Sequence, residues 1–364
     1  TRIVAFSPVS ESQRAISLSE VRLLAGLPAE TWSPVSDLDL EGTGLSDLVE
    51  SGLLICDGED PLAQRLRRRE ERLASLKWHP LAASYHFGNR LAEGKAQLID
   101  MEAMSESAES GASRFVEKHG SPPPPFRELD EPSKVIELPL SDKQGGLYDA
   151  LRARKTVRKF DPDRSLARNE LSTLLRYVFG CHGYSRISEI VLLHKTSPSG
   201  GSLHPIEAYP LVINVEGLSS GVYHYDVRDH SLESIRELDE EACRELAVEF
   251  CRGQQYASSA HALVLLVARF DRNQWKYRSR SRTYSVMLMD AGHLSQTFYL
   301  VAAELGLGAF FSAAIDGQRI EKVLNLDSIQ EGALGVCGCG VPQPGGTDLG
   351  LETQPFAPRS TRID

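Results

Sequence analysis

The feature that most constrains this chain is a run of four prolines inside residues 121–139, "SPPPPFRELDEPSKVIELP". Consecutive prolines adopt extended polyproline geometry and end any helix, so this segment predicts a spacer. A chain of 364 residues is also long enough for two or more domains. We therefore expect an N-terminal module over residues 1–120, a proline-rich linker over 121–139 and a larger domain over 140–364.

The charge and the cysteines restrict the partners of the protein. The formal net charge is −10, so we expect no binding to nucleic acid or to an anionic membrane surface. No apolar run approaches the roughly 18 residues of a membrane span, and the first residues have no signal-peptide pattern. The "CGC" at 337–339 is spaced too closely for a zinc knuckle. We expect a cytoplasmic protein with free, buried thiols and no metal site.

The N-terminal module is expected to consist of short helices. "LSEVRLLAGLP", "LSDLVESGLLICDGED" and the charged "LAQRLRRREERLASL" have helical spacing. Two helices, an "SGLL" end and a short strand are the order typical of a winged-helix module. The aromatic "WHPLAASYHFGNR" that follows is expected to pack this module against the larger domain. It contains His79 and His86, but two imidazoles without a third ligand make a poor metal site.

The larger domain mixes helices and strands, which predicts an α+β fold with helices around a mixed sheet. "GLYDALRARKTVRKF" starts as a helix, and "RNELSTLLRYVFG" is a second helix. "EAYPLVINVEG" and "GVYHYDVRDHSLESIRE" are predicted strands, the latter a hairpin that turns at residues 228–230. The apolar "HALVLLVARF" predicts a central strand buried on both faces. "YSVMLMDAGHLSQTFYLVAAELGLG" is a long helix with a continuous apolar seam, typical of a core or subunit-interface helix.

Three separate stretches suit parts of a flat cofactor that carries a phosphate. The first, "RARKTVRKFD", supplies Arg154, Lys155, Thr156 and Arg158 near a helix end. A phosphate dianion is bound by charge-assisted donors of this kind. A basic helix terminus that interacts only with its own dipole is the alternative for this stretch alone.

The other two stretches are rich in glycine. "SPSGGSLHPIEAYP" contains Pro198, Ser199, Gly200 and Gly201, which leave room for a planar ring and expose backbone N–H groups, although an ordinary turn has the same composition. In "ELGLGAFFSAAIDGQ" the long helix ends at Gly306, Leu307 and Gly308 and leads into a loop. There is no Rossmann fingerprint for a dinucleotide.

The order and spacing of these stretches over residues 145–343 resemble the nitroreductase-like flavoprotein family. The resemblance implies FMN at the interface of an intertwined homodimer. Arg154, Lys155, Thr156 and Arg158 would then hold the FMN phosphate and ribityl chain. The stretch 198–201 would line the isoalloxazine ring, and 306–308 would approach it from the other side. The family often adds a basic residue after the last strand, and "GCGVPQPGGTDLG" departs from that pattern because it has none.

Within this family the chain is most similar to the SagB/McbC-type peptide azoline dehydrogenases, which oxidise thiazolines and oxazolines in ribosomally made peptides to azoles. The features are "SPSGGSLHPIEAYP", "GVYHYD", "WHPLAASYHFGNR" and above all "WKY" before the long helix. The resemblance implies a precursor peptide as substrate and a complex with a cyclodehydratase. It also implies that the N-terminal module resembles the leader-recognition modules of peptide-modifying enzymes.

The resemblance assigns Lys276 and Tyr277 to catalysis, with the lysine as base. A lysine acts as a base only when its amine is uncharged, and apolar packing by Trp275 together with the like charges of Arg278, Arg280 and Arg282 favours that form. The same arginines are expected to bind an acidic peptide segment. Two alternatives stay open: these arginines only pair with acidic residues, and Lys276 is an ordinary surface lysine.

Four further residues have weaker assignments. His204 is a candidate substrate contact because it follows the glycine-rich loop. His293 is expected to be a packing histidine, and Glu207 and Asp290 to be partners of the nearby cations. Two other functions stay open: a flavin-dependent reductase of dehydroamino acids or nitro compounds, and a non-catalytic scaffold that binds a leader peptide.

Overall fold

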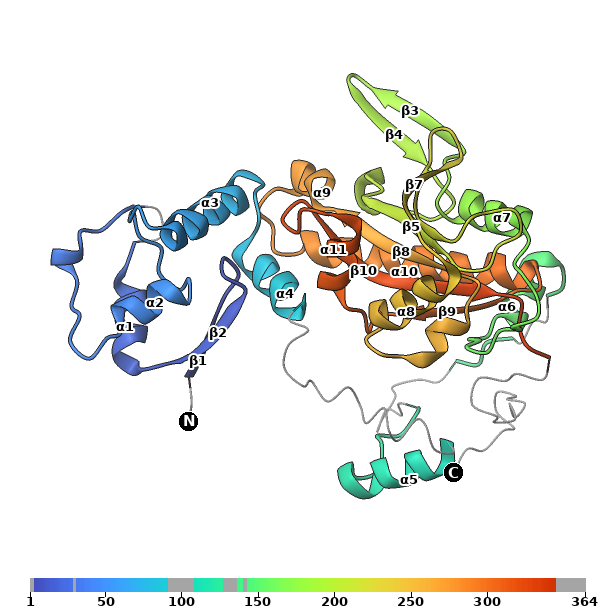
Figure 1. Cartoon of the computed structure of the whole chain (residues 1–364), viewed down its shortest axis with the longest axis horizontal. Helices are drawn as coiled ribbons and strands as arrows, with labels where there is room; N and C mark the ends of the chain where they lie inside the picture. The colour runs from blue at the N-terminus through green and yellow to red at the C-terminus, as the bar shows by residue number, and fades with distance from the viewer. Residues whose placement is uncertain (1–2, 29–30, 91–107, 127–135, 140–142, 345–364) are drawn as a thin grey trace.

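The centre of the molecule is a six-stranded sheet (Figure 1). The computed structural model describes residues 3–28, 31–90, 108–126, 136–139 and 143–344. The strands are β5 (Ile206–Val212), β6 (Gly221–Asp226), β7 (Ser231–Glu237), β8 (Ala262–Arg269), β9 (Gly308–Ser312) and β10 (Glu331–Gly340). Their spatial order is β7-β6-β5-β8-β10-β9.

The pairings between these strands are antiparallel. Among the described residues, parallel contacts are confined to two isolated bridges, Thr156 with Ala309 and Leu166 with Val215. The parallel component of the expected mixed sheet is therefore limited to these bridges. The predicted hairpin is confirmed, because Asp226 pairs with Ser231 across a turn at residues 227–230.

Strand β8 is buried on both faces, as the apolar run predicts. Successive side chains of a strand point to opposite faces. Val264 and Leu266 belong to one apolar cluster, whereas Leu263, Leu265 and Val267 belong to another. The sheet therefore separates two cores.

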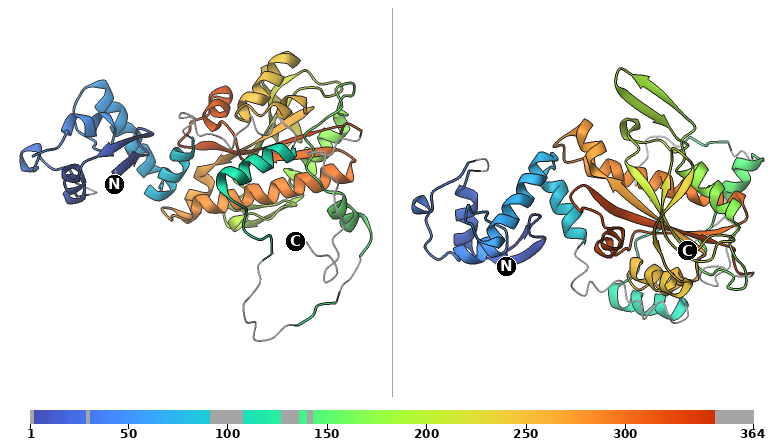
Figure 2. Two further views of the ribbon diagram at one scale, coloured as in Figure 1. Left: turned by 90° about the horizontal axis from the view of Figure 1, so that it is seen from below. Right: turned by 45° about the horizontal axis from the view of Figure 1, so that its top comes forward.

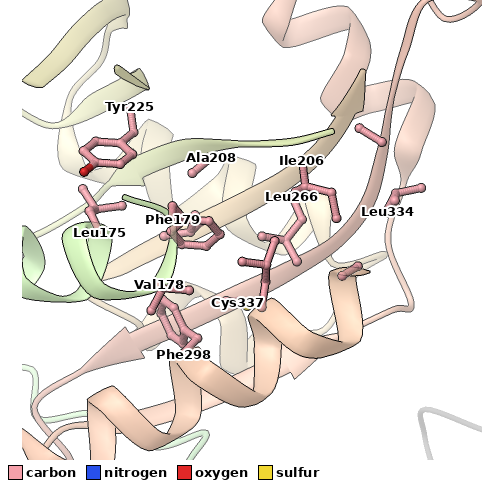
Figure 3. Close-up of a cluster of buried hydrophobic side chains, with 14 of the residues drawn as sticks. Leu175, Val178, Phe179, Ile206, Ala208, Tyr225, Leu266, Phe298, Leu334 and Cys337 are labelled. Atoms are coloured by element: carbon pink, nitrogen blue, oxygen red, sulfur yellow. The ribbon is translucent and has the colours of Figure 1, made fainter. Parts of the chain in front are cut away.

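Helices cover both faces of the sheet (Figure 2). They are α6 (Gly146–Ala153), α7 (Arg168–Val178), α8 (Glu240–Phe250), α9 (Phe270–Tyr277), α10 (Thr283–Glu304) and α11 (Gly317–Leu324). Helices α7 and α10 pack on one face, where Leu175 lies beside Tyr225 of the sheet and Val178 lies beside Phe298 (Figure 3). Side chains of α8 and α11 belong to the core on the other face. The long apolar helix is therefore confirmed as a core helix.

The N-terminal elements are β1 (Ile3–Ser7), β2 (Ser12–Ile16), α1 (Leu18–Gly26), α2 (Leu45–Glu50), α3 (Pro61–Ser75), α4 (Pro80–Arg90) and α5 (Ala108–His119). The three predicted helices form; Ser17 and Asp60 cap α1 and α3. The strand expected after α2 is absent from the described residues 51–60. The N–H groups of Leu53 and Leu54 instead donate to the carbonyl of Leu48, which closes a turn. The β1–β2 hairpin precedes the helices, so the described residues do not follow the expected winged-helix order.

Segment 78–90 packs on the larger domain, as predicted. Trp78 and Phe87 belong to the same apolar cluster as the face of the sheet that α10 covers, and the indole N–H of Trp78 donates to the carbonyl of Ile329 at 3.0 Å.

Another hairpin, β3 (Gly183–Ile187) with β4 (Ile190–His194), projects from the body of the larger domain (Figure 1). It was not predicted, and it leads directly into the glycine-rich loop. Within the described part of the chain, no helix combines the length and apolar character that crossing a bilayer requires.

Candidate active site

The glycine-rich loop at 198–201 is fixed to α10 by a buried carboxylate. The hydroxyl of Ser199 donates to Asp290 at 2.6 Å, and the backbone N–H of Gly200 donates to the other carboxylate oxygen at 3.2 Å. The same hydroxyl accepts the N–H of His204 at 2.9 Å. Burial raises the pKa of Asp290, and the two donors oppose that rise. Asp290 therefore holds the loop, whereas the sequence analysis expected it to be a partner of the nearby cations.

Two further contacts continue this attachment along α10. Ser197 bonds the hydroxyl of Thr297 at 2.7 Å, and Nδ1 of His293 lies 3.2 Å from the carbonyl of Pro198. Asp290, His293 and Thr297 recur at a spacing of three and four, so they share one side of the helix. The expectation that His293 is a packing residue is wrong, because its side chain is exposed and faces the loop.

The loop requires glycine at two positions because other groups approach it closely. Gly201 has φ +67°, and a Cβ there would lie 2.6 Å from Nζ of Lys276 and 2.8 Å from the hydroxyl of Tyr277. A Cβ at Gly200 would lie 2.3 Å from Cγ1 of Val286. The absence of side chains thus brings the amine and the phenol against the backbone of the loop.

Helix α9 places two cations on the carbonyl groups of this loop. Nζ of Lys276 donates to the carbonyl of Gly201 at 3.4 Å, and Nε of Arg272 donates to that of Leu203 at 2.7 Å. Residues 272 and 276 are four apart and therefore share a helix face. The structure thus brings together the Lys-Tyr pair and the glycine-rich loop, which the sequence placed 75 residues apart.

The basic segment after Tyr277 is open to solvent. Arg278, Arg280 and Arg282 are exposed, and none forms an ion pair within the described part of the chain. Trp275 is 55% exposed, and Lys276 is exposed as well. The apolar packing that Trp275 was expected to give the amine is therefore not provided within one chain. Simple pairing of these arginines with acidic residues is not observed either.

The segment 154–158 runs beside β9. The N–H of Val157 donates to the carbonyl of Ala309 at 2.8 Å. This places the segment next to the turn after α10 and the start of β9 at Gly308, where the sequence predicted a loop. The hydroxyl of Thr156 lies 3.1 Å from that of Tyr299, and the guanidinium of Arg154 lies 5.5 Å from the centroid of the Tyr299 ring. The guanidinium of Arg158 lies over the ring of Tyr256. The first and third predicted stretches therefore meet.

A cleft of about 600 Å³ opens where they meet. Its lining includes Ala153, Lys155, Val157, Tyr299, Ala303, Gly306, Leu307, Gly308, Ala309 and Pro342. Gly308 is needed there, because a Cβ would lie 2.7 Å from Cγ1 of Val157. A cleft with the cation Lys155 and glycines in its wall fits a cofactor that carries a phosphate. The stretch 338–350, in which the family's basic residue after the last strand is missing, extends beyond the described residues.

The two candidate cofactor regions contact different parts of α10. The loop at 198–201 is attached at Asp290 to Thr297, whereas the cleft is lined by Tyr299 and Ala303. Asp290 and Ala303 are about 20 Å apart along the helix axis at roughly 1.5 Å per residue. One chain therefore presents these regions along a line and not around a single closed pocket.

Lys195, which the sequence analysis did not single out, lies beside the loop, near Pro198 and His204. It is half-buried, and burial lowers its pKa while the carboxylate of Glu207 opposes this. Glu207 also lies 3.5 Å from the guanidinium of Arg269, which confirms it as a partner of cations. Burial and the nearby Lys195 lower the pKa of His204 to about 4, and its Nε2 lies 3.0 Å from the carbonyl of Leu193. The role of His204 as a substrate contact stays a prediction. No pattern in the sequence distinguished Lys195 from other lysines.

The described residues contain no group of three or more His, Cys, Asp or Glu side chains arranged to hold a metal ion. His79 and His86 have separate partners: Nδ1 of His79 accepts the N–H of Leu81 at 3.1 Å, and Nδ1 of His86 lies 3.0 Å from the hydroxyl of Tyr284.

The fold and these sites define the class of the protein. Residues 151–341 match the model of the nitroreductase family, and the chain belongs to that family. Members typically bind a flavin and act as oxidoreductases. MJ1384 of Methanocaldococcus jannaschii, a candidate nitroreductase by its name, is 32% identical over 193 residues, which are 53% of this chain and 91% of that protein.

Two other relatives are proteins named for the processing of a trifolitoxin or a microcin. The trifolitoxin-processing protein TfxB of Rhizobium leguminosarum bv. trifolii is 35% identical over 39% of this chain and 38% of its own length. The microcin B17-processing protein McbC of Escherichia coli is 31% identical over 36% of this chain and 48% of its own length. The chain thus matches less than half the length of each of these two relatives.

Proposed function

We propose that the protein is an FMN-dependent dehydrogenase that oxidises azoline rings to azoles in a ribosomally synthesised peptide. The observation that carries this proposal is the position of Lys276 and Tyr277 against the backbone of Gly201. A simple reductase of the family needs no amine at this loop. The names of TfxB and McbC support a peptide as the substrate.

The reaction removes one proton and one hydride from neighbouring ring carbons, so each ring loses two hydrogen atoms and gains one double bond. Bound FMN supplies the hydride acceptor. The chain must hold the ring and take the proton. Lys276 in its uncharged form accepts the proton from the ring α-carbon, and the Tyr277 hydroxyl orients the ring or shares in the transfer.

The cleft beside β9 would hold the phosphate end of FMN, with Arg154, Lys155 and Arg158 as donors. Thr156 and Tyr299 would fix the wall of the cleft, because their hydroxyls bond each other and the hydroxyl of Tyr299 accepts the N–H of Phe311 at 2.9 Å. Gly200 and Gly201 would bring their backbone to the ring system, while the side chains of Val286, Lys276 and Tyr277 take the space that a Cβ at either glycine would need.

A second copy of the chain would bring the two regions together. The face of α10 beside the loop includes the exposed Met289 and His293, and α6 exposes Leu147 and Leu151 on its surface. Exposed apolar side chains of this kind mark a subunit interface. A homodimer that covers both helices would place the loop of one copy over the cleft of the other. Light scattering on the purified protein tests this, and Met289→Glu with Leu147→Glu should give monomers that have lost the flavin.

The exposed Arg278 and Arg280 are the candidate contacts for an acidic part of the peptide. A complex with a cyclodehydratase would supply the azoline substrate, because the ring must be formed before it is oxidised.

The test is to purify the protein, record its visible spectrum and incubate it with a cyclised precursor peptide. A flavin spectrum and a mass loss of about two units per ring are the expected results, since one proton and one hydride leave together. A reductase would instead be established if the protein shows a flavin spectrum, adds hydrogen to a nitro or dehydroamino substrate and removes no hydrogen from azolines. A colourless protein that still binds the leader peptide would establish the scaffold.

A further inference from the structure

The segment that carries Lys276 is held at its two ends by residues outside the family domain. Phe270 begins α9 and Tyr284 lies in the first turn of α10. The residues between them include Lys276, Tyr277 and the exposed arginines. Both end residues are buried, Phe270 completely and Tyr284 to 8% exposure. Between the two buried aromatic rings, Asn273, Gln274 and Thr283 are also buried, whereas residues 275–276 and 278–282 are exposed.

Both rings contact the same two side chains of the N-terminal part. Ring centroids of Trp78 and Phe270 are 4.9 Å apart, and those of His86 and Phe270 are 4.8 Å apart, both edge to face. The His86 ring also lies 5.3 Å from that of Tyr284, and its Nδ1 is 3.0 Å from the Tyr284 hydroxyl. Trp78 stacks on His86 at 5.5 Å. One cluster therefore touches both ends of the segment.

The cluster has no room to shift. A Cβ at Gly332 would lie 2.6 Å from the ring of Phe270 and 2.8 Å from that of His86, so the backbone of β10 presses directly on both rings. Trp78 is further fixed by its hydrogen bond to the carbonyl of Ile329. At the end of α4, Arg90 pairs with the buried Glu321 of α11. Close packing of this kind fixes side-chain positions.

We propose that Trp78 and His86 are positioning residues for Lys276, and that they act by holding the two ends of segment 271–283 against the larger domain. Their positions precede the residues 151–341 that match the family, so the N-terminal part contributes to the active-site geometry. The role of this positioning in catalysis rests on the proposed function, whereas the holding of segment 271–283 does not. Burial lowers the pKa of His86 to about 3, so its hydrogen bond to Tyr284 stays the same across neutral pH.

Trypsin digestion of the full, flavin-loaded chain measures how firmly segment 271–283 is held. Arg278, Arg280 and Arg282 are exposed cleavage sites inside this segment. Tyr284→Phe removes one oxygen and keeps the ring, and His86→Phe keeps a ring and removes the bonding nitrogen. Each variant should raise the initial cleavage rate in the segment about fivefold, the factor that one net hydrogen bond represents. The double variant should cleave no faster than either single one, since both remove the same bond.

Two controls separate this effect from general loosening. Cleavage at the exposed Arg186 of the β3–β4 hairpin and at Arg228 of the β6–β7 turn should not change. In turnover, kcat should fall in both single variants while KM for the peptide and flavin content stay at wild-type values. Unchanged cleavage in the segment, or an equal rise at Arg228, would overturn the proposal. Full turnover in Lys276→Ala would remove the proposed function and leave the cleavage result standing.

Discussion

The hydroxyl of Ser199 lies 2.6 Å from the buried carboxylate of Asp290 and connects the glycine-rich loop to the long core helix. The same carboxylate accepts the N–H of Gly200. The loop against which Lys276 rests is therefore positioned by the core of the domain.

Asp290→Ala should loosen the loop and lower the stability of the fold. It leaves the Ser199 hydroxyl and the Gly200 N–H without their acceptor, which costs about 1–3 kcal/mol in a buried place. Asp290→Asn should lose less, because one acceptor oxygen remains. Urea unfolding gives the stability, and turnover should fall with it. An alanine variant with wild-type stability and turnover would show that the carboxylate does not hold the loop.

Gly201→Ala should impair turnover more than stability. Gly201 has φ +67°, and its new methyl group would lie 2.6 Å from Nζ of Lys276, so the amine must move. Gly217→Ala is the matched control, since Gly217 has φ +68° and nothing within 4 Å of the added Cβ. Both variants should lose about 1 kcal/mol of unfolding free energy through backbone strain. Equal kcat in the two variants would contradict the assigned position of Lys276.

Arg154→Ala should weaken FMN binding and leave riboflavin binding unchanged. A charged hydrogen bond to phosphate is worth about 1.5–3 kcal/mol, or at least tenfold in Kd. Riboflavin lacks the phosphate and therefore serves as the control ligand. Fluorescence titration of the flavin-free protein measures both constants. Equal losses for both ligands would place Arg154 away from the phosphate.

His224 should make stability depend on pH between about 6.5 and 8. The Glu207 and Glu233 carboxylates raise the pKa of His224 to about 8. The pKa of His224 is higher in the folded state than in the unfolded state. Its contribution to the free energy of unfolding is therefore complete below pH 6.5 and is lost as pH rises through 8. Discounted for partial exposure, it amounts to about 1 kcal/mol. Urea unfolding at pH 6 and pH 9 should show this loss in the wild type and not in His224→Gln.

Much of the fold could be predicted because its strongest patterns are local. The apolar run at 261–270 and the seam of the long helix are periodic signals that burial enforces. Strand β10 gave no such signal because its sequence, "EGALGVCGCG", is rich in glycine, which disfavours strands. The structure explains the glycines: a Cβ at Gly338 would lie 2.2 Å from the ring of Phe310, and one at Gly335 would lie 2.5 Å from that of Phe311.

The site was predicted as separate motifs and not as an arrangement. Lys276, Tyr277 and Gly201 stood out by type and by resemblance, but their contact depends on how α9 returns over the loop. Asp290 was noted without its partner, since nothing local links it to Ser199. Exposure was predicted worst: Trp275 was expected to cover the amine and is exposed in the single chain. The contacts and the exposure of these side chains depend on long-range packing, which the periodicity of the sequence does not reveal.

The most direct test of the account is Lys276→Ala, with flavin content and ring oxidation measured on the same preparation. The amine rests on the loop at Gly201 and away from the cleft beside β9, so the variant should keep its flavin spectrum. It should lose most of the turnover seen as a mass loss per ring, about 10²–10⁴-fold for the removal of a general base. Retained flavin together with undiminished oxidation of azolines would contradict the central claim.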